Sequence, residues 1–165
     1  MQAFRSSILH FKQDAQAEYF DDGILVVEND KVKQVGAAQD LLPTLQGITI
    51  TEYENKIIMP GFIDTHIHYP QVDVIASYGE QLLDWLNNYT FPTEIQFEDP
   101  EFAADTANFF LNELLKNGTT TALVFGTKHK QSVDAFFEAS SALNTRMICG
   151  KVMMNRNAPE ELCDD

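Results

Sequence analysis

The pattern of apolar and polar residues changes character near Pro60. Before it, short β-branched runs alternate with turn residues, and the pair Asn29-Asp30 is typical of a tight turn between two strands. The strands expected in this part cover residues 24–28, 31–35, 48–51 and 57–58. The polar segment 13–22 is expected to be a loop. Because this meander holds few large apolar residues, its strands need another surface on which to bury one face.

After Pro60 the chain alternates between strands and helices. The clearest helix begins at Asp99, which suits an N-cap, and Pro100 follows at the first helical position. Apolar residues then recur at helical spacing up to Lys116, and Gly118 provides the stop. The other elements are expected to be strands at 61–68, 119–125 and 147–154 and helices at 82–89 and 132–143. This alternation, with short links, predicts an α/β domain with a parallel sheet and right-handed crossovers.

Composition and charge narrow the functional classes. The chain has 165 residues, of which 44% are apolar and 22% charged, which is typical of a globular protein. No apolar run reaches the roughly 18 residues of a membrane span, and residues 1–11 lack the layout of a signal peptide, so we expect a cytoplasmic protein with no membrane partner. A net charge of −14 disfavours nucleic acid as a partner. Cys149 and Cys163 form neither a CxxC pair nor a disulfide framework.

His66 and His68 are the strongest candidates for chemistry. They lie at the end of the strand expected at 61–68, and their spacing of two residues projects both imidazole rings from the same face. One nitrogen of each ring can then bind a single metal ion. Zinc suits histidine nitrogens, and iron is compatible. Sites of α/β proteins form at this carboxyl end of the strands. The pair could instead be structural, with hydrogen-bonded rings.

Residues 59–68, with the sequence MPGFIDTHIH, resemble the first barrel strand of the amidohydrolase superfamily. Further segments resemble the guanine deaminases of that superfamily in order and spacing. These are HYPQ at 68–71, LLDWL at 82–86, YTFPTE at 89–94, NGTTTA at 117–122 and GKVMM at 150–154. The HxH pair is common to the superfamily, whereas Gln71 and the YTFPTE segment are more specific. The resemblance spans this chain but only the N-terminal portion of those enzymes.

The resemblance implies an α/β fold in which residues 59–165 form the first part of a TIM-like (β/α)8 metal-dependent hydrolase barrel. Residues 1–58 would form part of the small β-sandwich that accompanies that barrel. A complete barrel takes about 250 residues. We therefore expect an incomplete barrel of about three strands, with an open sheet edge at residues 147–154.

The same resemblance implies a reaction. In guanine deaminases, water activated by one zinc ion attacks C2 of guanine, ammonia leaves and xanthine forms. His66 and His68 match the two zinc ligands of the first strand. Gln71 matches a residue that binds the base, for which an amide offers both a donor and an acceptor. Trp85 and Phe91 could wall the purine pocket, although core packing is at least as well supported for each. Relatives suggest a homodimer.

A catalytic zinc site takes three protein ligands and an open position, and two candidate ligands are present. The resemblance places the family's further histidine, its glutamate proton shuttle and its catalytic aspartate beyond Asp165. No catalytic residue is therefore expected within this chain, and the 165-residue chain alone is expected to be an inactive fragment that binds zinc weakly.

Other candidate residues have weaker grounds. His129 follows the strand expected at 119–125 and matches a histidine of relatives, but Lys128-His129-Lys130 is equally typical of a solvated turn. Asp64 shares a strand face with His66 and could orient its ring, although a structural hydrogen bond is the simpler interpretation. The remaining expectations are a buried Cys149, a tail thiol at Cys163, a solvated Glu113 and a His10 with no partner that we can name.

Two other functions stay open. The chain could belong to an amidohydrolase that acts on another aminopurine, a triazine or an imidazolone ring, although Gln71 and residues 89–94 argue against this. It could also be a non-catalytic module that binds a partner chain, for which an exposed sheet edge is unfavourable. A zinc cytidine-deaminase fold is disfavoured because the H-x-E and P-C-x-x-C motifs of that class do not occur in the sequence.

Overall fold

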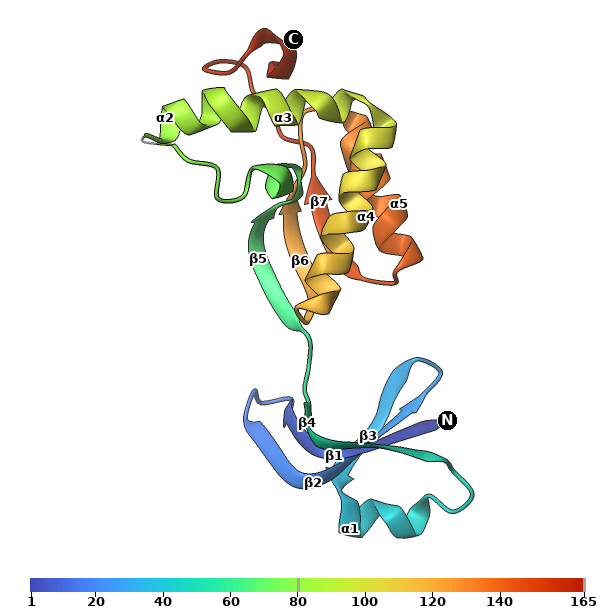
Figure 1. Ribbon diagram of the computed structural model, residues 1–165. Helices are drawn as coiled ribbons and strands as arrows, with labels where there is room; N and C mark the ends of the chain where they lie inside the picture. The colour runs from blue at the N-terminus through green and yellow to red at the C-terminus, as the bar shows by residue number, and fades with distance from the viewer. Residues whose placement is uncertain (80, 165) are drawn as a thin grey trace. The chain divides into compact units, whose positions relative to one another are not determined.

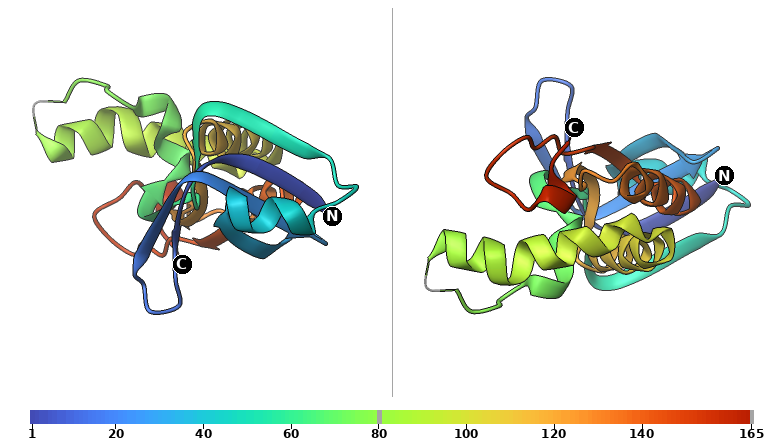
Figure 2. Two further views of the ribbon diagram at one scale, coloured as in Figure 1. Left: turned by 90° about the horizontal axis from the view of Figure 1, so that it is seen from below. Right: turned by 90° about the horizontal axis from the view of Figure 1, so that it is seen from above.

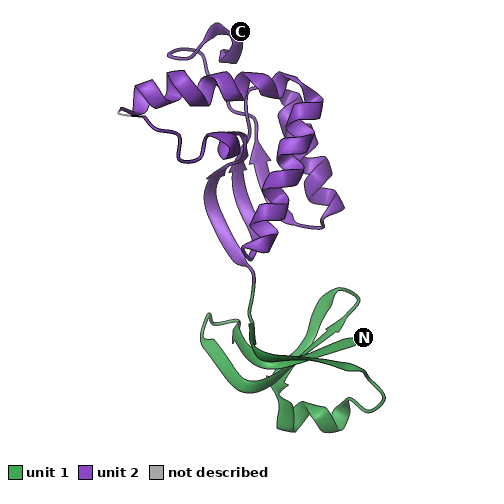
Figure 3. Ribbon diagram, in the orientation of Figure 1, with its two compact units in different colours: residues 1–60 green, residues 61–165 purple. Residues whose placement is uncertain are grey.

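The computed structural model describes residues 1–79 and 81–164. The chain divides into two compact units, which we call unit 1 (Met1–Pro60) and unit 2 (Gly61–Asp165), and each unit has its own sheet (Figure 3). The segment 59–165, expected to form the barrel portion, lies within the described residues except at positions 80 and 165.

Unit 1 is built on a four-stranded sheet with the order β3-β2-β1-β4 (Figure 1). Its strands are β1 (Gln2–Phe11), β2 (Ala17–Glu28), β3 (Lys31–Ala37) and β4 (Ile50–Ile58). Strand β4 pairs in parallel with β1, and the other pairs are antiparallel. Helix α1 (Ala38–Leu41) and the 3₁₀ turn η1 (Leu42–Thr44) follow β3, and Leu41 is buried against Ile24 and Val26 of β2. The expected turn is confirmed, since Asn29 and Asp30 have φ angles of 51° and 60°.

Two expectations for unit 1 are wrong. Strand β2 begins at Ala17, so the second half of the expected loop at 13–22 is a strand. The polar residues that suggested a loop bind partners on β1: Glu18 lies 2.9 Å from the ring nitrogen Nε2 of His10, and Asp22 pairs with Arg5 at 2.7 Å. Such cross-strand pairs stabilise exposed strand faces. The strands expected at 48–51 and 57–58 also differ, because they merge into the single strand β4.

Unit 2 contains a parallel sheet in the order β5-β6-β7, as the alternation of strands and helices predicted. Its strands are β5 (Phe62–His68), β6 (Thr119–Phe125) and β7 (Arg146–Gly150), so the last strand is shorter than expected. Helices α4 (Pro100–Lys116) and α5 (Lys130–Ala142) lie side by side against one face of the sheet (Figures 1 and 2). Ala122 and Val124 of β6 are buried there, whereas Leu123 points to the other face and is 39% exposed.

The connection from β5 to α4 carries a 3₁₀ turn followed by a helical rod. The turn is η2 (Tyr69–Val74). The rod comprises α2 (Leu82–Trp85), the π-helical turn η3 (Leu86–Thr90), α3 (Phe91–Ile95) and the 3₁₀ turn η4 (Gln96–Glu98). The helix expected at 82–89 is therefore confirmed, and it continues beyond its expected end. A last 3₁₀ turn, η5 (Glu160–Leu162), lies near the C-terminus.

Helix α4 begins as the sequence indicated. The Asp99 carboxylate accepts a hydrogen bond from the backbone N–H of Glu101 at 2.9 Å, and Pro100 occupies the first helical position. We expect Asp99→Ala to lower the free energy of unfolding by about 1 kcal/mol, because it removes this cap. Asp99→Asn keeps an acceptor and should cost much less. Equilibrium urea denaturation measures both, and an alanine variant as stable as the parent would contradict the assignment.

Candidate metal and substrate site

The two histidines at the end of β5 are arranged as ligands of one metal ion would be. His66 and His68 are separated by one strand period, and their Nε2 atoms lie 3.3 Å apart. Two imidazole nitrogens bound tetrahedrally to zinc at about 2.0–2.1 Å would be separated by about 3.3 Å. The residues present therefore fit a shared zinc ion.

Phe125 packs against both imidazole rings and was not anticipated from the sequence. It is the last residue of β6 and is paired in register with His68. Its ring centroid lies 4.5 Å from that of His68 in a stacked arrangement and 4.8 Å from that of His66. Because the carboxyl ends of parallel strands meet at one edge, the end of the strand expected at 119–125 could have indicated this contact. Phe125 thus holds the rings in place.

The environment of His68 favours the form that binds metals. Burial and, to a smaller extent, the neighbouring His66 lower the pKa of the His68 imidazole. A lowered pKa keeps the ring neutral near pH 7, and a neutral nitrogen lone pair is what a metal ligand needs.

Asp64 binds the backbone of His66 and not its ring. The Asp64 carboxylate accepts a hydrogen bond from the N–H of His66 at 2.9 Å, which agrees with the expectation of a structural hydrogen bond.

Gln71 lies next to the histidine pair. It belongs to η2, directly after β5, and its Nε2 atom lies 3.4 Å from Nδ1 of His68. The same Nε2 atom donates a hydrogen bond to Oε1 of Glu94 at 3.3 Å. The structure therefore brings three sequence-predicted residues together and adds Glu94 of α3, which sequence reasoning missed.

Glu94 is a buried carboxyl group, with 7% of the residue exposed. Burial raises its pKa, and the hydrogen bond from Gln71 acts in the opposite direction. Since the pKa of Glu94 is higher in the folded than in the unfolded chain, the folded state binds this proton more tightly. The corresponding stability is present at low pH and is lost as the pH rises through the folded pKa.

We therefore expect Glu94→Gln, which cannot ionise, to gain stability relative to the parent as the pH rises from 4 to 8. The measurement is the free energy of unfolding of both proteins by urea denaturation at several pH values. Glu138→Gln, at an exposed position of α5, is the matched control and should show no such trend. A difference between parent and Glu94→Gln that is independent of pH would contradict the expectation.

A hollow of about 390 Å³ lies beside the histidines. Besides His66, His68 and Gln71 it is lined mainly by apolar side chains, among them Val72, Ile75, Phe110 and Leu114. Trp85 and Phe91 do not line it: Trp85 packs beside Gly79, and Phe91 is 9% exposed. Their role as walls of a purine pocket stays a prediction. Glu113 also lines the hollow, and its partly exposed side chain forms an ion pair with Lys116.

His129 is buried, although the sequence Lys128-His129-Lys130 is typical of a solvated turn. The expectation of a solvated His129 is therefore wrong: the residue is 8% exposed and lies at the N-cap of α5. Thr127 and Ser132 enclose its backbone in hydrogen bonds, and burial lowers the pKa of its ring. Within residues 1–79 and 81–164, no group of three His, Cys, Asp or Glu side chains could hold a metal ion, so His129 does not complete the pair.

Cys149 and Cys163 are both free and half-buried, so Cys149 is less buried than expected. Burial raises the pKa of the Cys149 thiol to about 11, so it remains protonated and unreactive near pH 7.

Across the described part of the chain, no helix combines the length and apolarity needed to span a membrane.

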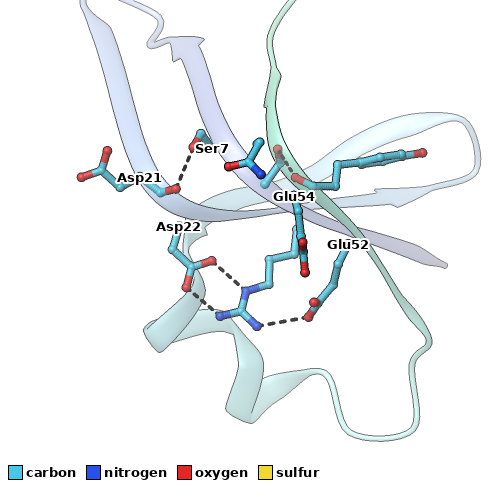
Figure 4. A pocket seen from close by; sticks show the side chains of 9 residues that line it. Ser7, Asp21, Asp22, Glu52 and Glu54 are labelled. Atoms are coloured by element: carbon cyan, nitrogen blue, oxygen red, sulfur yellow. Dashed lines mark hydrogen bonds and ion pairs between the residues drawn. The ribbon is translucent and has the colours of Figure 1, made fainter.

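A second hollow, in unit 1, offers no comparable chemistry. Asp22 and Glu52 face into it (Figure 4), and both bind the Arg5 guanidinium, at 2.7 and 3.2 Å. The guanidinium group of Arg5 is thereby neutralised by two carboxylates, and most of the other residues that line the hollow are polar. This arrangement ties β1 to β2 and β4 across the sheet.

Known proteins resemble this chain over most of its length. Over 147 residues the chain is 54% identical to the guanine deaminase of Escherichia coli, a match that covers 88% of this chain and 34% of that enzyme. It is 34% identical to a probable guanine deaminase of Deinococcus radiodurans, covering 98% and 39% of the two chains. The chain thus spans little more than a third of the length of these relatives.

Solved structures give the same result. The structure of E. coli guanine deaminase matches with a TM-score of 0.93 and 47% identity, covering 100% of this chain and 40% of that chain. A guanine deaminase from C. acetobutylicum with bound guanine matches with a TM-score of 0.86 and 32% identity, covering 99% and 39%. The family model of the amidohydrolases matches residues 57–165, which include the His66–His68 pair. The chain therefore belongs to the amidohydrolase family.

Proposed function

We propose that this chain supplies two zinc ligands, His66 and His68, and a base-binding glutamine, Gln71, to a guanine deaminase that hydrolyses guanine to xanthine and ammonia. The observation that carries the proposal is the 3.3 Å separation of the two Nε2 atoms, with the Gln71 amide beside them. A metal site next to a hydrogen-bonding amide suits the hydrolysis of a neutral purine.

Similarity and charge support guanine as the substrate. The relatives with the highest identity described above are guanine deaminases, and one of the matching structures holds guanine in its active site. Guanine carries no phosphate, so the net charge of −14 does not oppose its binding.

Each residue has a defined task in this proposal. His66 and His68 offer neutral imidazole nitrogens to the metal, and Phe125 holds their rings. A zinc ion bound there supplies the activation of water that hydrolysis needs. Gln71 binds an edge of the purine and so orients it toward the histidine pair. None of these residues is assigned a proton transfer, which we place in the part of the enzyme beyond residue 165.

The same proposal extends to fold and assembly. Residues 59–165 form the first part of a TIM-like hydrolase barrel, supported by the parallel order β5-β6-β7 with helices on one face. Residues 1–58 form part of the small β-sandwich, supported by the mixed sheet of unit 1. A homodimer and a cytoplasmic location are proposed on family grounds.

The test is to isolate the native gene product from its source cells, saturate it with zinc and supply guanine. We expect equal amounts of xanthine and ammonia. Adenine and an amino-triazine serve as comparison substrates. Preferential turnover of either would replace guanine deamination by another amidohydrolase activity. Hydrolysis of none of them, together with a stable complex with a second protein, would favour the non-catalytic module.

A further inference from the structure

A buried carboxyl group holds the residue proposed to bind the base. Within residues 1–79 and 81–164, Glu94 is the one buried acidic residue. Burying a carboxyl group is costly unless it is hydrogen-bonded, so the partner that it keeps in the interior is informative. Its partner is the Gln71 amide, 23 residues earlier in the chain.

We propose that Glu94 is a positioning residue that fixes the orientation of the Gln71 carboxamide toward the substrate. This inference rests on the proposed function, because it assumes that Gln71 binds the purine. An amide can rotate by 180° and exchange its donor for its acceptor, which would reverse the edge that it recognises. A fixed partner is needed to select one orientation.

Two neighbours reach the Gln71 amide nitrogen, and only one of them is a dependable acceptor. Nδ1 of His68 lies 3.4 Å away and Oε1 of Glu94 lies 3.3 Å away. When His68 binds a metal through Nε2, its Nδ1 carries the proton and becomes a donor. A protonated Nδ1 can donate a hydrogen bond to the amide oxygen of Gln71 but cannot accept one from the amide nitrogen. Oε1 of Glu94, by contrast, can accept a hydrogen bond from that nitrogen. Glu94 is therefore the group that keeps the nitrogen of Gln71 turned toward α3.

The local helix geometry places Glu94 where it can act in this way. The π-helical turn η3 directly precedes α3. One additional residue in a helical turn rotates all later side chains by about 100° around the helix axis. This turn therefore helps to set which face Glu94 occupies, and that face packs against η2, where Gln71 lies.

The test uses the zinc-loaded native protein and four variants: Glu94→Ala, Glu94→Gln, Gln71→Ala and the double alanine variant. Glu94→Ala should raise the KM for guanine at least about 10-fold and change kcat by less than about threefold, because a loosened amide weakens binding. Glu94→Gln keeps an acceptor oxygen and should recover most of this loss. When Gln71 is already alanine, adding Glu94→Ala should change KM by less than about twofold.

Zinc content and the unfolding midpoint are measured alongside, and Glu138→Ala on α5 is the control. A purely structural Glu94 would lower the midpoint and raise KM equally with and without Gln71, and that result would overturn the inference. An unchanged KM in Glu94→Ala would also overturn it. In both cases the parent protein still converts guanine, so the proposed function survives. If the parent does not convert guanine, both proposals fail together.

Discussion

Replacing His66 by alanine should lower the zinc affinity of the native protein at least about 100-fold. Mutating a residue that only orients a metal ligand already lowers the metal affinity by about 10–100-fold. Because His66 is proposed to be a ligand itself, its loss should have at least the upper end of this effect. Guanine deamination should fall at least about 1,000-fold, since a bound metal contributes several kcal/mol to the stabilisation of the transition state. The corresponding variant His68→Ala should behave in the same way.

The geometry explains why both substitutions should have equivalent effects. The two Nε2 atoms are 3.3 Å apart, so either ring alone leaves one half of the proposed site empty. The fold should tolerate the loss of His66, because its side chain is exposed at the end of β5. His68 stacks on Phe125, so its removal should also cost some packing. A loss of zinc without a loss of structure is therefore clearest in His66→Ala.

Zinc affinity is measured by competition with a chromophoric chelator, and the fold is checked by circular dichroism. His10→Ala is the matched control, because His10 lies in unit 1 and pairs with Glu18. It should leave zinc affinity unchanged. If His66→Ala retained the full zinc affinity, the metal site would have to lie elsewhere, and the proposed function would lose the observation that carries it.

The histidine pair could be predicted from the sequence because its geometry is local. Side chains two residues apart in a strand point to the same face, whatever the rest of the fold does. The same holds for the start of α4, where Asp99 and Pro100 need only their own helix to form a cap. Both predictions depend on backbone geometry within a few residues.

The roles of Glu94 and Phe125 do not follow from local geometry, because they depend on packing between segments that are distant in the sequence. Glu94 looks like an ordinary polar helix residue until α3 packs against η2 and buries it. Phe125 looks like one more apolar strand residue until register places it opposite His68. The error at residues 17–22 has the same origin, since Glu18 and Asp22 are suited to a strand only when His10 and Arg5 lie across from them.

Tyr69→Ala should produce the largest loss of stability in unit 2, about 3–5 kcal/mol. Tyr69 directly follows His68 and is fully buried. Its ring packs against those of Phe97 and Phe136, with centroids 5.2 and 5.1 Å away. Its hydroxyl donates a hydrogen bond to the backbone carbonyl of Ser132 at 2.6 Å. Removing the ring leaves a cavity where η2 is anchored against α4 and α5.

The phenylalanine variant separates the ring from the hydroxyl. Tyr69→Phe keeps the packing but leaves the buried carbonyl of Ser132 without this donor, so it should cost about 1–3 kcal/mol. Tyr78→Ala is the control, because Tyr78 is 76% exposed and its removal should change stability by less than about 0.5 kcal/mol. Urea denaturation of the three variants gives the free energies of unfolding.

Because Tyr69 fixes the junction between His68 and Gln71, the alanine variant should also weaken zinc binding, whereas the phenylalanine variant should not. An alanine variant that lost stability but kept its zinc affinity would show that the site does not depend on this anchor.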